Sequence, residues 1–244
     1  MLIPSQVYTN HYGESGRGLS PRLWSRIGSH GAAPDGSQGF FISDDFLKFQ
    51  GFTNAISGTT TLPSTTVPSP SGYKIYVDST TSASGVSRLA TEPGGVARFA
   101  PGGTDNHLAI IGAGILGELS VTAGEEKLTI FEARVRLHTQ VSSGSTFIGL
   151  GTDSLVADGG LIADAGGLLA TGAGIGFRTK EDDPDGFDVV YQAASQTEMV
   201  VSDAAKVIAA DTWVKLGFCY DPAAQPSKKI SFFVDNAELT SYVT

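Results

Sequence analysis

Hydrophobic and polar side chains alternate residue by residue in several short stretches of this chain. The clearest case lies within residues 128–139, where apolar residues alternate with charged residues or histidine from Phe131 to His138. Successive side chains of a strand point to opposite faces, so this pattern predicts a strand with one buried face. Similar alternation predicts strands over residues 73–78, 187–191, 214–220 and 230–234.

Turn-forming residues lie between the predicted strands, as at Asp158-Gly159, Pro184-Asp185-Gly186 and Asp221-Pro222. Many short strands joined by such turns are typical of an all-β sandwich or barrel. Few segments have the pattern of a long amphipathic helix, and residues 202–210 are the best candidate for a short one.

The first 40 residues have no hydrophobic period and are rich in Gly, Ser and Pro. Such a segment buries too little apolar area to offset its chain entropy alone. It is either a disordered tail or an arm that orders on a partner surface, with Tyr8, Tyr12 and Trp24 as its anchors. We expect an extended irregular arm over residues 1–40, followed by a sandwich domain over residues 41–244. Deleting the arm should then abolish attachment and leave the sandwich folded.

Two late segments carry a resemblance to a known fold family. Residues 213–221 read WVKLGFCYD and residues 229–236 read KISFFVDN. They resemble the late strands of concanavalin A-like lectin/glucanase sandwiches, which include laminin-G-like modules. Residues 43–46 resemble the opening strand of that fold, residues 129–137 its central strand and residues 145–150 the strand after it. The resemblance implies an antiparallel, jelly-roll-like β-sandwich over most of residues 40–244.

The composition adds a second resemblance, to virion proteins of tailed phages. The chain contains 31 glycines, and only 17% of its residues are charged. Gly-rich β proteins with an irregular arm resemble capsid decoration, head-fibre and tail-fibre proteins. This implies a phage virion structural protein, either a capsid decoration or cement protein or a head fibre, assembled in the host cytoplasm. Its expected partners are the major capsid protein or other virion proteins and further copies of itself, with a trimer as one form.

Charge and cysteine content narrow the classes of partner. The formal net charge is −9, which argues against nucleic-acid binding because that requires a basic surface. The single cysteine allows no intramolecular disulfide. No apolar run reaches the length of about 18 residues that a membrane-spanning helix needs, and the first residues do not read as a signal peptide. We therefore expect neither a nucleic-acid nor a membrane partner.

Two other functions remain as alternatives. A lectin-like module for tail or host adhesion would bind carbohydrate through exposed aromatic residues or a metal at loop tips. A dinucleotide-dependent enzyme would use residues 112–117, which read GAGILG and match G-x-G-x-x-G, with Glu132 twenty residues after Gly112. The residues between them are poor helix formers, so a strand, a glycine-rich loop and another strand is the simpler interpretation.

Other candidate chemistry is weak, and we expect no enzyme activity, catalytic residue, metal or cofactor. A glucanase strand carries alternating carboxylates, whereas the polar face here has one carboxylate, Glu132, beside Arg134 and Arg136. We expect Glu132 and Arg134 to form a cross-face ion pair or a solvated stripe. The acidic run 181–188 is either an ordinary hairpin turn or a calcium site. The four histidines have no zinc-site spacing, and Cys219 is predicted to be a small buried hydrophobic residue.

Overall fold

The computed structural model describes residues 19–26, 65–66, 73–78, 85–89, 96–100, 108–113, 127–138, 145–151, 173–180, 186–193, 196–207 and 209–243. The chain divides into two compact units. One unit combines Met1–Pro34 with Leu119–Thr244, and the other is Asp35–Glu118. The sandwich domain predicted for residues 41–244 therefore includes most of both units.

The described strands of the unit Asp35–Glu118 form two small antiparallel sheets. In the first, β2 (Tyr73–Asp78) lies between β1 (Thr65–Thr66) and β5 (Leu108–Ala113). In the second, β3 (Gly85–Arg88) pairs with β4 (Ala97–Ala100). The strand predicted over residues 73–78 is confirmed with the same bounds.

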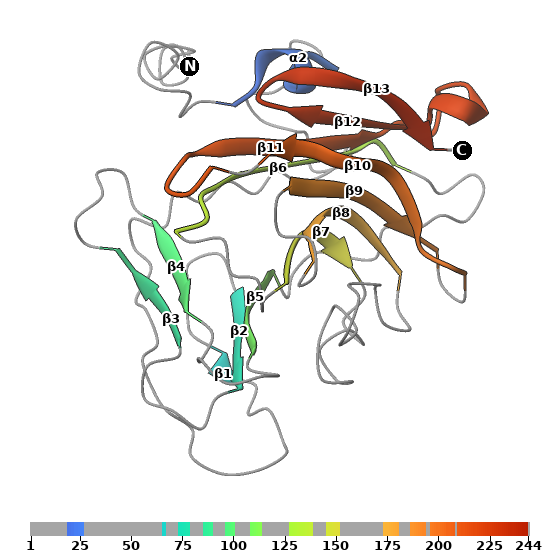
Figure 1. The fold of residues 1–244 in the computed structure, drawn as a ribbon. Helices are drawn as coiled ribbons and strands as arrows, with labels where there is room; N and C mark the ends of the chain where they lie inside the picture. Colours follow the sequence, from blue (N-terminus) through green and yellow to red (C-terminus); the bar gives the residue numbers. More distant parts are fainter. Residues whose placement is uncertain are drawn as a thin grey trace, which may run out of the picture. The chain divides into compact units, whose positions relative to one another are not determined.

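The larger unit is an antiparallel β-sandwich of two four-stranded sheets, as predicted (Figure 1). The first sheet has the order β13-β12-β11-β6, with β6 (Thr129–Val135), β11 (Val214–Tyr220), β12 (Ile230–Val234) and β13 (Ala237–Val243). The second has the order β10-β9-β8-β7, with β7 (Thr146–Gly151), β8 (Gly174–Thr179), β9 (Gly186–Gln192) and β10 (Met199–Val207). The chain leaves β6, builds the whole second sheet and returns to pair β11 with β6.

The core lies between the inner faces of the two sheets. Phe177 of β8 meets Phe232 of β12 edge to face, with 5.9 Å between the ring centroids. Phe218 stacks on Phe131 of the neighbouring strand at 5.3 Å. The inward residues of β11 are Val214, Leu216, Phe218 and Tyr220, which is the alternation read from the sequence. Burial of these inner faces is the main stabilising contribution to the sandwich.

The predicted helix over residues 202–210 is wrong, because Met199–Val207 forms strand β10. The strand pairs with β9 through an irregular register in which Ala204 adopts a positive φ of 45°. Asp188 of β9 accepts a hydrogen bond from the Ala204 amide at 3.0 Å, and Val201 and Ala205 pack against the core. Cross-strand contacts thus override the helical propensity of an alanine-rich segment.

The position of β6 also differs from the central strand that the family resemblance implies. Within the described strands, β6 lies at the end of its sheet and pairs with β11 alone. The chain moves to the second sheet directly after β6, so the next strand, β7, does not pair with it. The strand expected over residues 145–150 is confirmed as β7, in that second sheet.

A two-residue turn between β12 and β13 fastens the two sheets at one end. Asp235 and Asn236 have φ values of 48° and 67°, as a type I′ hairpin turn requires. The Asp235 carboxylate accepts the Lys215 amide at 3.0 Å and pairs with the Lys206 ammonium of β10 at 2.7 Å. This side chain therefore connects a turn of one sheet to the edge strand of the other.

Two substitutions at Asp235 should separate the contribution of the turn to stability from that of the ion pair. Asp235→Ala removes the acceptor for the Lys215 amide and a residue type that tolerates positive φ, so we expect a loss of about 2 kcal/mol of unfolding free energy. Asp235→Asn retains both features and removes the charge, so its loss should stay below about 1 kcal/mol. Urea denaturation of both variants provides the measurement, and equal losses would refute this division of roles.

Candidate functional site: the docked N-terminal segment

Residues 19–26, here called the docking segment, lie on the outer face of the sheet formed by β6, β11, β12 and β13 (Figure 1). The segment contains one helical turn, α2 (Pro21–Trp24). Pro21 occupies the start of the turn, where its missing N–H costs nothing. The Trp24 amide donates to the Ser20 carbonyl at 3.0 Å. This turn places Ser20, Leu23 and Trp24 toward the sheet.

Leu23 is the apolar anchor of the docking segment. Its side chain is fully buried and packs with Cys219 and Phe233 on the outer face of the sheet. A methyl group added at Gly217 would lie 2.6 Å from Leu23 Cδ2 and 2.9 Å from the carbonyl oxygen of Phe131. Gly217 therefore provides the space that Leu23 fills, which explains a glycine inside a buried strand.

Glu132 is the polar anchor. Its carboxylate accepts the Ser20 amide at 3.0 Å and the Trp24 indole N–H at 2.7 Å. The Ser20 hydroxyl donates to the same group at 3.2 Å, and Lys215 Nζ lies 3.9 Å away. Only 7% of this side chain is exposed, and a buried carboxylate is tolerated because hydrogen bonds and a cation surround it.

The rim of the docking site is complementary in charge. Glu238 of β13 pairs with Arg22 at 3.4 Å and with Arg26 at 3.1 Å. The Arg22 amide donates to the Asn236 side chain at 2.9 Å, and the Arg26 guanidinium lies over the Phe233 ring at 5.3 Å. The segment thus presents two cations to a carboxylate on the sheet.

These contacts bear on the predicted anchors in different ways. Trp24 contacts its own chain through Glu132, while Tyr8 and Tyr12 lie outside the described residues. The interpretation of Glu132 as part of a solvated stripe is wrong, because the docking segment covers it. Its neighbour Arg134 lies over the Trp213 ring at 4.1 Å. No local signal marks Glu132, since its partner Ser20 lies 112 positions away in the sequence.

Cys219 behaves as predicted, as a buried hydrophobic residue. Burial raises the pKa of its thiol to about 11, which outweighs the opposing effect of Arg26. The thiolate that nucleophilic chemistry needs is therefore scarce near neutral pH.

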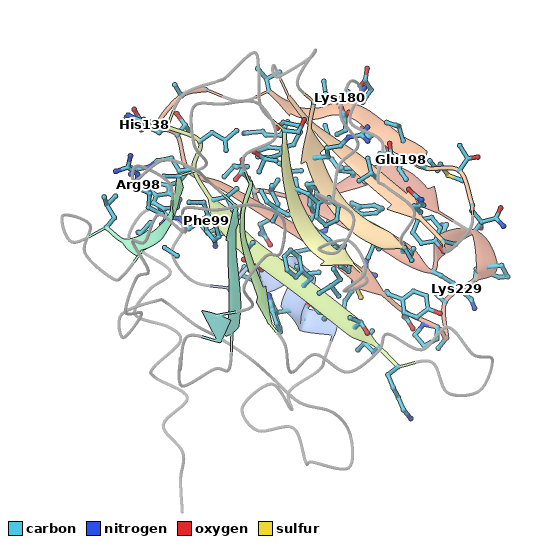
Figure 2. The ribbon with its side chains drawn as sticks, turned by 90° about the horizontal axis from the view of Figure 1, so that it is seen from below. Arg98, Phe99, His138, Lys180, Glu198 and Lys229 are labelled. Carbon is cyan, nitrogen blue, oxygen red and sulfur yellow. The ribbon has the colours of Figure 1, made fainter. Side chains whose placement is uncertain are left out.

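The other predicted chemical sites are only partly described. Gly112 lies inside β5, which pairs antiparallel with β2 opposite Lys74, whereas a dinucleotide fold needs a parallel sheet. Residues 114–117 and the acidic residues 181–185 lie outside the described part, as does the expected opening strand at residues 43–46. Among the described residues, no group of three or more His, Cys, Asp or Glu is placed to hold a metal ion. His138, at an exposed edge of the sandwich (Figure 2), pairs with Asp211 at 2.8 Å.

A second polar cluster occupies the outer face of the other sheet. Arg178 of β8 is fully buried and pairs with Glu198 and, at 3.5 Å, with Asp188. Lys180 Nζ lies 3.3 Å from the Asp188 carboxylate. Lys180 and Glu198 can be found by their labels in Figure 2. Burial alone would raise the pKa of Asp188, but the Ala204 amide, Asp203 and Lys180 together outweigh it and lower this pKa. The cluster joins β8, β9 and the start of β10.

Comparisons with known proteins assign no family to this chain: no family model, no curated protein and no solved structure matches it. None of the described helices is long and apolar enough to cross a membrane.

A double-mutant cycle should test the fit between Leu23 and Gly217. Leu23→Ala should cost about 2–4 kcal/mol by leaving a cavity, and Gly217→Ala about 1–3 kcal/mol by overpacking. The double variant should lose less than the sum, because the shortened side chain no longer meets the new methyl group. Some cost at Gly217 should persist through the Phe131 carbonyl oxygen. Chemical denaturation gives all three values, and strict additivity would show that the two positions do not touch.

The lowered pKa of Asp188 predicts an acid dependence with a definite sign. A carboxyl whose pKa is lower in the folded state stabilises the fold above its ordinary value of 3.8, and this contribution is lost as the pH falls through the folded-state pKa. Between about pH 5 and pH 3 the wild type should therefore lose stability more steeply than Asp188→Asn. The exposed Asp211, whose pKa His138 lowers, serves as the control position and should show a smaller difference. Denaturation at several pH values measures both slopes, and parallel curves for wild type and Asp188→Asn would contradict the assignment.

Proposed function

We propose that this chain is a phage virion structural protein, a capsid decoration or cement protein or a head-fibre protein that attaches through its N-terminal arm. We also propose that its sandwich belongs with the concanavalin A-like folds. The observation that carries the proposal is the docking segment. A displayed domain keeps a fixed orientation relative to its attachment when the arm is also packed against it, and residues 19–26 pack against the sandwich through Leu23 and Glu132.

We assign different roles to two parts of the proposed arm. Residues 19–26 belong to the sandwich, so the preceding 18 residues start from a fixed point on the outer face of the sheet. A chain of that length reaches about 60 Å when fully extended. Within it, Tyr8 and Tyr12 are the proposed contacts to the major capsid protein, because large aromatic side chains dominate the energy of many interfaces. Trp24 takes the role of fastening the arm.

Display on a particle also fits the charge of the chain. A net charge of −9 keeps a crowded protein layer soluble and disfavours binding to nucleic acid. Attachment through a short arm is weak for one copy, but repeated copies on a symmetric shell multiply weak contacts into a lasting association.

Quantitative mass spectrometry of purified particles from the source tests the proposed function. A ratio to the major capsid protein near one, or near a simple symmetric fraction, is expected for a decoration or cement protein. A few copies per particle would indicate a fibre, and absence from particles would overturn the proposal.

The division of the arm changes what a deletion should do. Removing residues 1–18 should abolish co-sedimentation with particles and leave the thermal unfolding temperature within about 2 °C of the full chain. Removing residues 1–26 should also lower that temperature, because it removes the contacts of Leu23 with Cys219 and Phe233 and the hydrogen bonds of Ser20 and Trp24 to Glu132. The sandwich of this shorter chain should still fold, with lower stability than in the full chain. Retained co-sedimentation of the shorter deletion would refute attachment through the arm.

Carbohydrate binding remains the second candidate because of one surface feature. Trp213 lies against two guanidinium groups, with Arg134 at 4.1 Å and Arg136 at 4.9 Å from its ring centroid. An aromatic ring next to arginines suits an acidic sugar, whose ring stacks and whose carboxylate pairs with the cations. A glycan array probed with the full chain and with Trp213→Ala tests this candidate, and binding that the substitution does not change would remove it.

A further inference from the structure

The docking segment and its site form a complete interface between two parts of one chain that are far apart in sequence. The contacts between the docking segment and the sheet join residues 20–26 to positions 130–238, across sequence separations of up to 216 residues. The compact unit Asp35–Glu118 lies between the two partners in the sequence. The same contacts therefore form when the segment comes from one chain and the sheet from another.

We propose that the docking segment exchanges between copies of this protein, so that the segment of one copy occupies the sheet of a second. The partner is a second copy of this chain, because the site is shaped for this particular segment. Its apolar part accepts Leu23 over Gly217, and its polar part binds the Ser20 and Trp24 donors at Glu132. Its rim places Glu238 opposite Arg22 and Arg26. A reciprocal exchange fills both sites and closes a dimer without any new contact.

Concentration decides between the two arrangements. Docking within one chain must bring the segment and the sheet together on either side of the compact unit Asp35–Glu118, and closing such a connection costs chain entropy. Docking between chains has no such closure term and depends on how crowded the copies are. Dilute protein should therefore keep its own segment, and crowded protein should exchange it. This inference does not rest on a virion location, because it applies to the purified chain in solution.

A pair of charge-reversed full-length chains tests the exchange directly. The first chain carries Arg22→Glu and Arg26→Glu, and the second carries Glu238→Arg. Each chain then repels its own segment at the rim, whereas each segment is attracted to the other chain's sheet. Native mass spectrometry of the equimolar mixture should show a 1:1 heterodimer as the main species, at twice the 25.3 kDa chain mass, and each chain alone should remain mostly monomeric.

The matched control places all three substitutions in one chain, so that the segment and the sheet again carry opposite charges at the rim. That chain should behave like the wild type and be mainly monomeric when dilute. A mixture that contains no heterodimer, while the triple variant folds normally, would overturn the proposal.

A second measurement avoids substitutions altogether. Isotopically labelled and unlabelled wild-type chains, mixed at millimolar concentration, should yield mixed dimers that disappear on dilution. A chain truncated by residues 1–26 should form no such dimers under the same conditions. Dimers that persist without the docking segment would show that another surface joins the copies and would contradict the exchange.

Discussion

A buried carboxylate on the outer face of a sheet is the constraint on which the N-terminal part of this structure depends. Glu132 occupies a strand position where solvent would ordinarily surround it, yet the docking segment covers it and supplies its hydrogen-bond donors. The segment that removes water from this carboxylate also supplies donors in place of the water, which offsets the cost of burying the charge. The outer face of this sheet is therefore incomplete without residues 19–26. The fit of Leu23 over Gly217 adds an apolar contact that admits little variation in shape.

The same principle organises the second sheet. Arg178 is buried on its outer face among Glu198, Asp188 and Lys180, and Asp188 holds the irregular backbone of β10 at Ala204. In both sheets the inner face follows simple apolar packing, while the outer face carries charged groups. The partners of Glu132 come from a distant segment, and those of Arg178 come from the next strand and the residues that follow it. The inner faces make the protein a sandwich, and the outer faces fix its edges and its N-terminal segment.

The inner faces were predictable from the sequence because alternation with a period of two is a local property. It located β6, β9, β11 and β12, together with the inward residues of β11. The outer faces were not predictable, since the alternation that marks Glu132 as polar cannot show that a segment over 100 residues away covers it. Gly217 was the one local clue, because a glycine inside a strand indicates close approach by another part of the chain. The helix predicted over residues 202–210 is wrong for a related reason. The backbone there follows the hydrogen bond from the Ala204 amide to Asp188 in the neighbouring strand, and not the helical propensity of the segment itself.

The reactivity of the single cysteine tests the central claim most directly. Cys219 lies beneath Leu23, so its thiol should react with an aromatic disulfide reagent only when the docking segment is absent. The full chain and a chain that lacks residues 1–18 should react equally slowly, whereas a folded chain that lacks residues 1–26 should react at least about tenfold faster, as expected when a buried thiol becomes accessible. Equal reaction rates in all three chains would show that residues 19–26 do not cover the sheet, and would contradict the account.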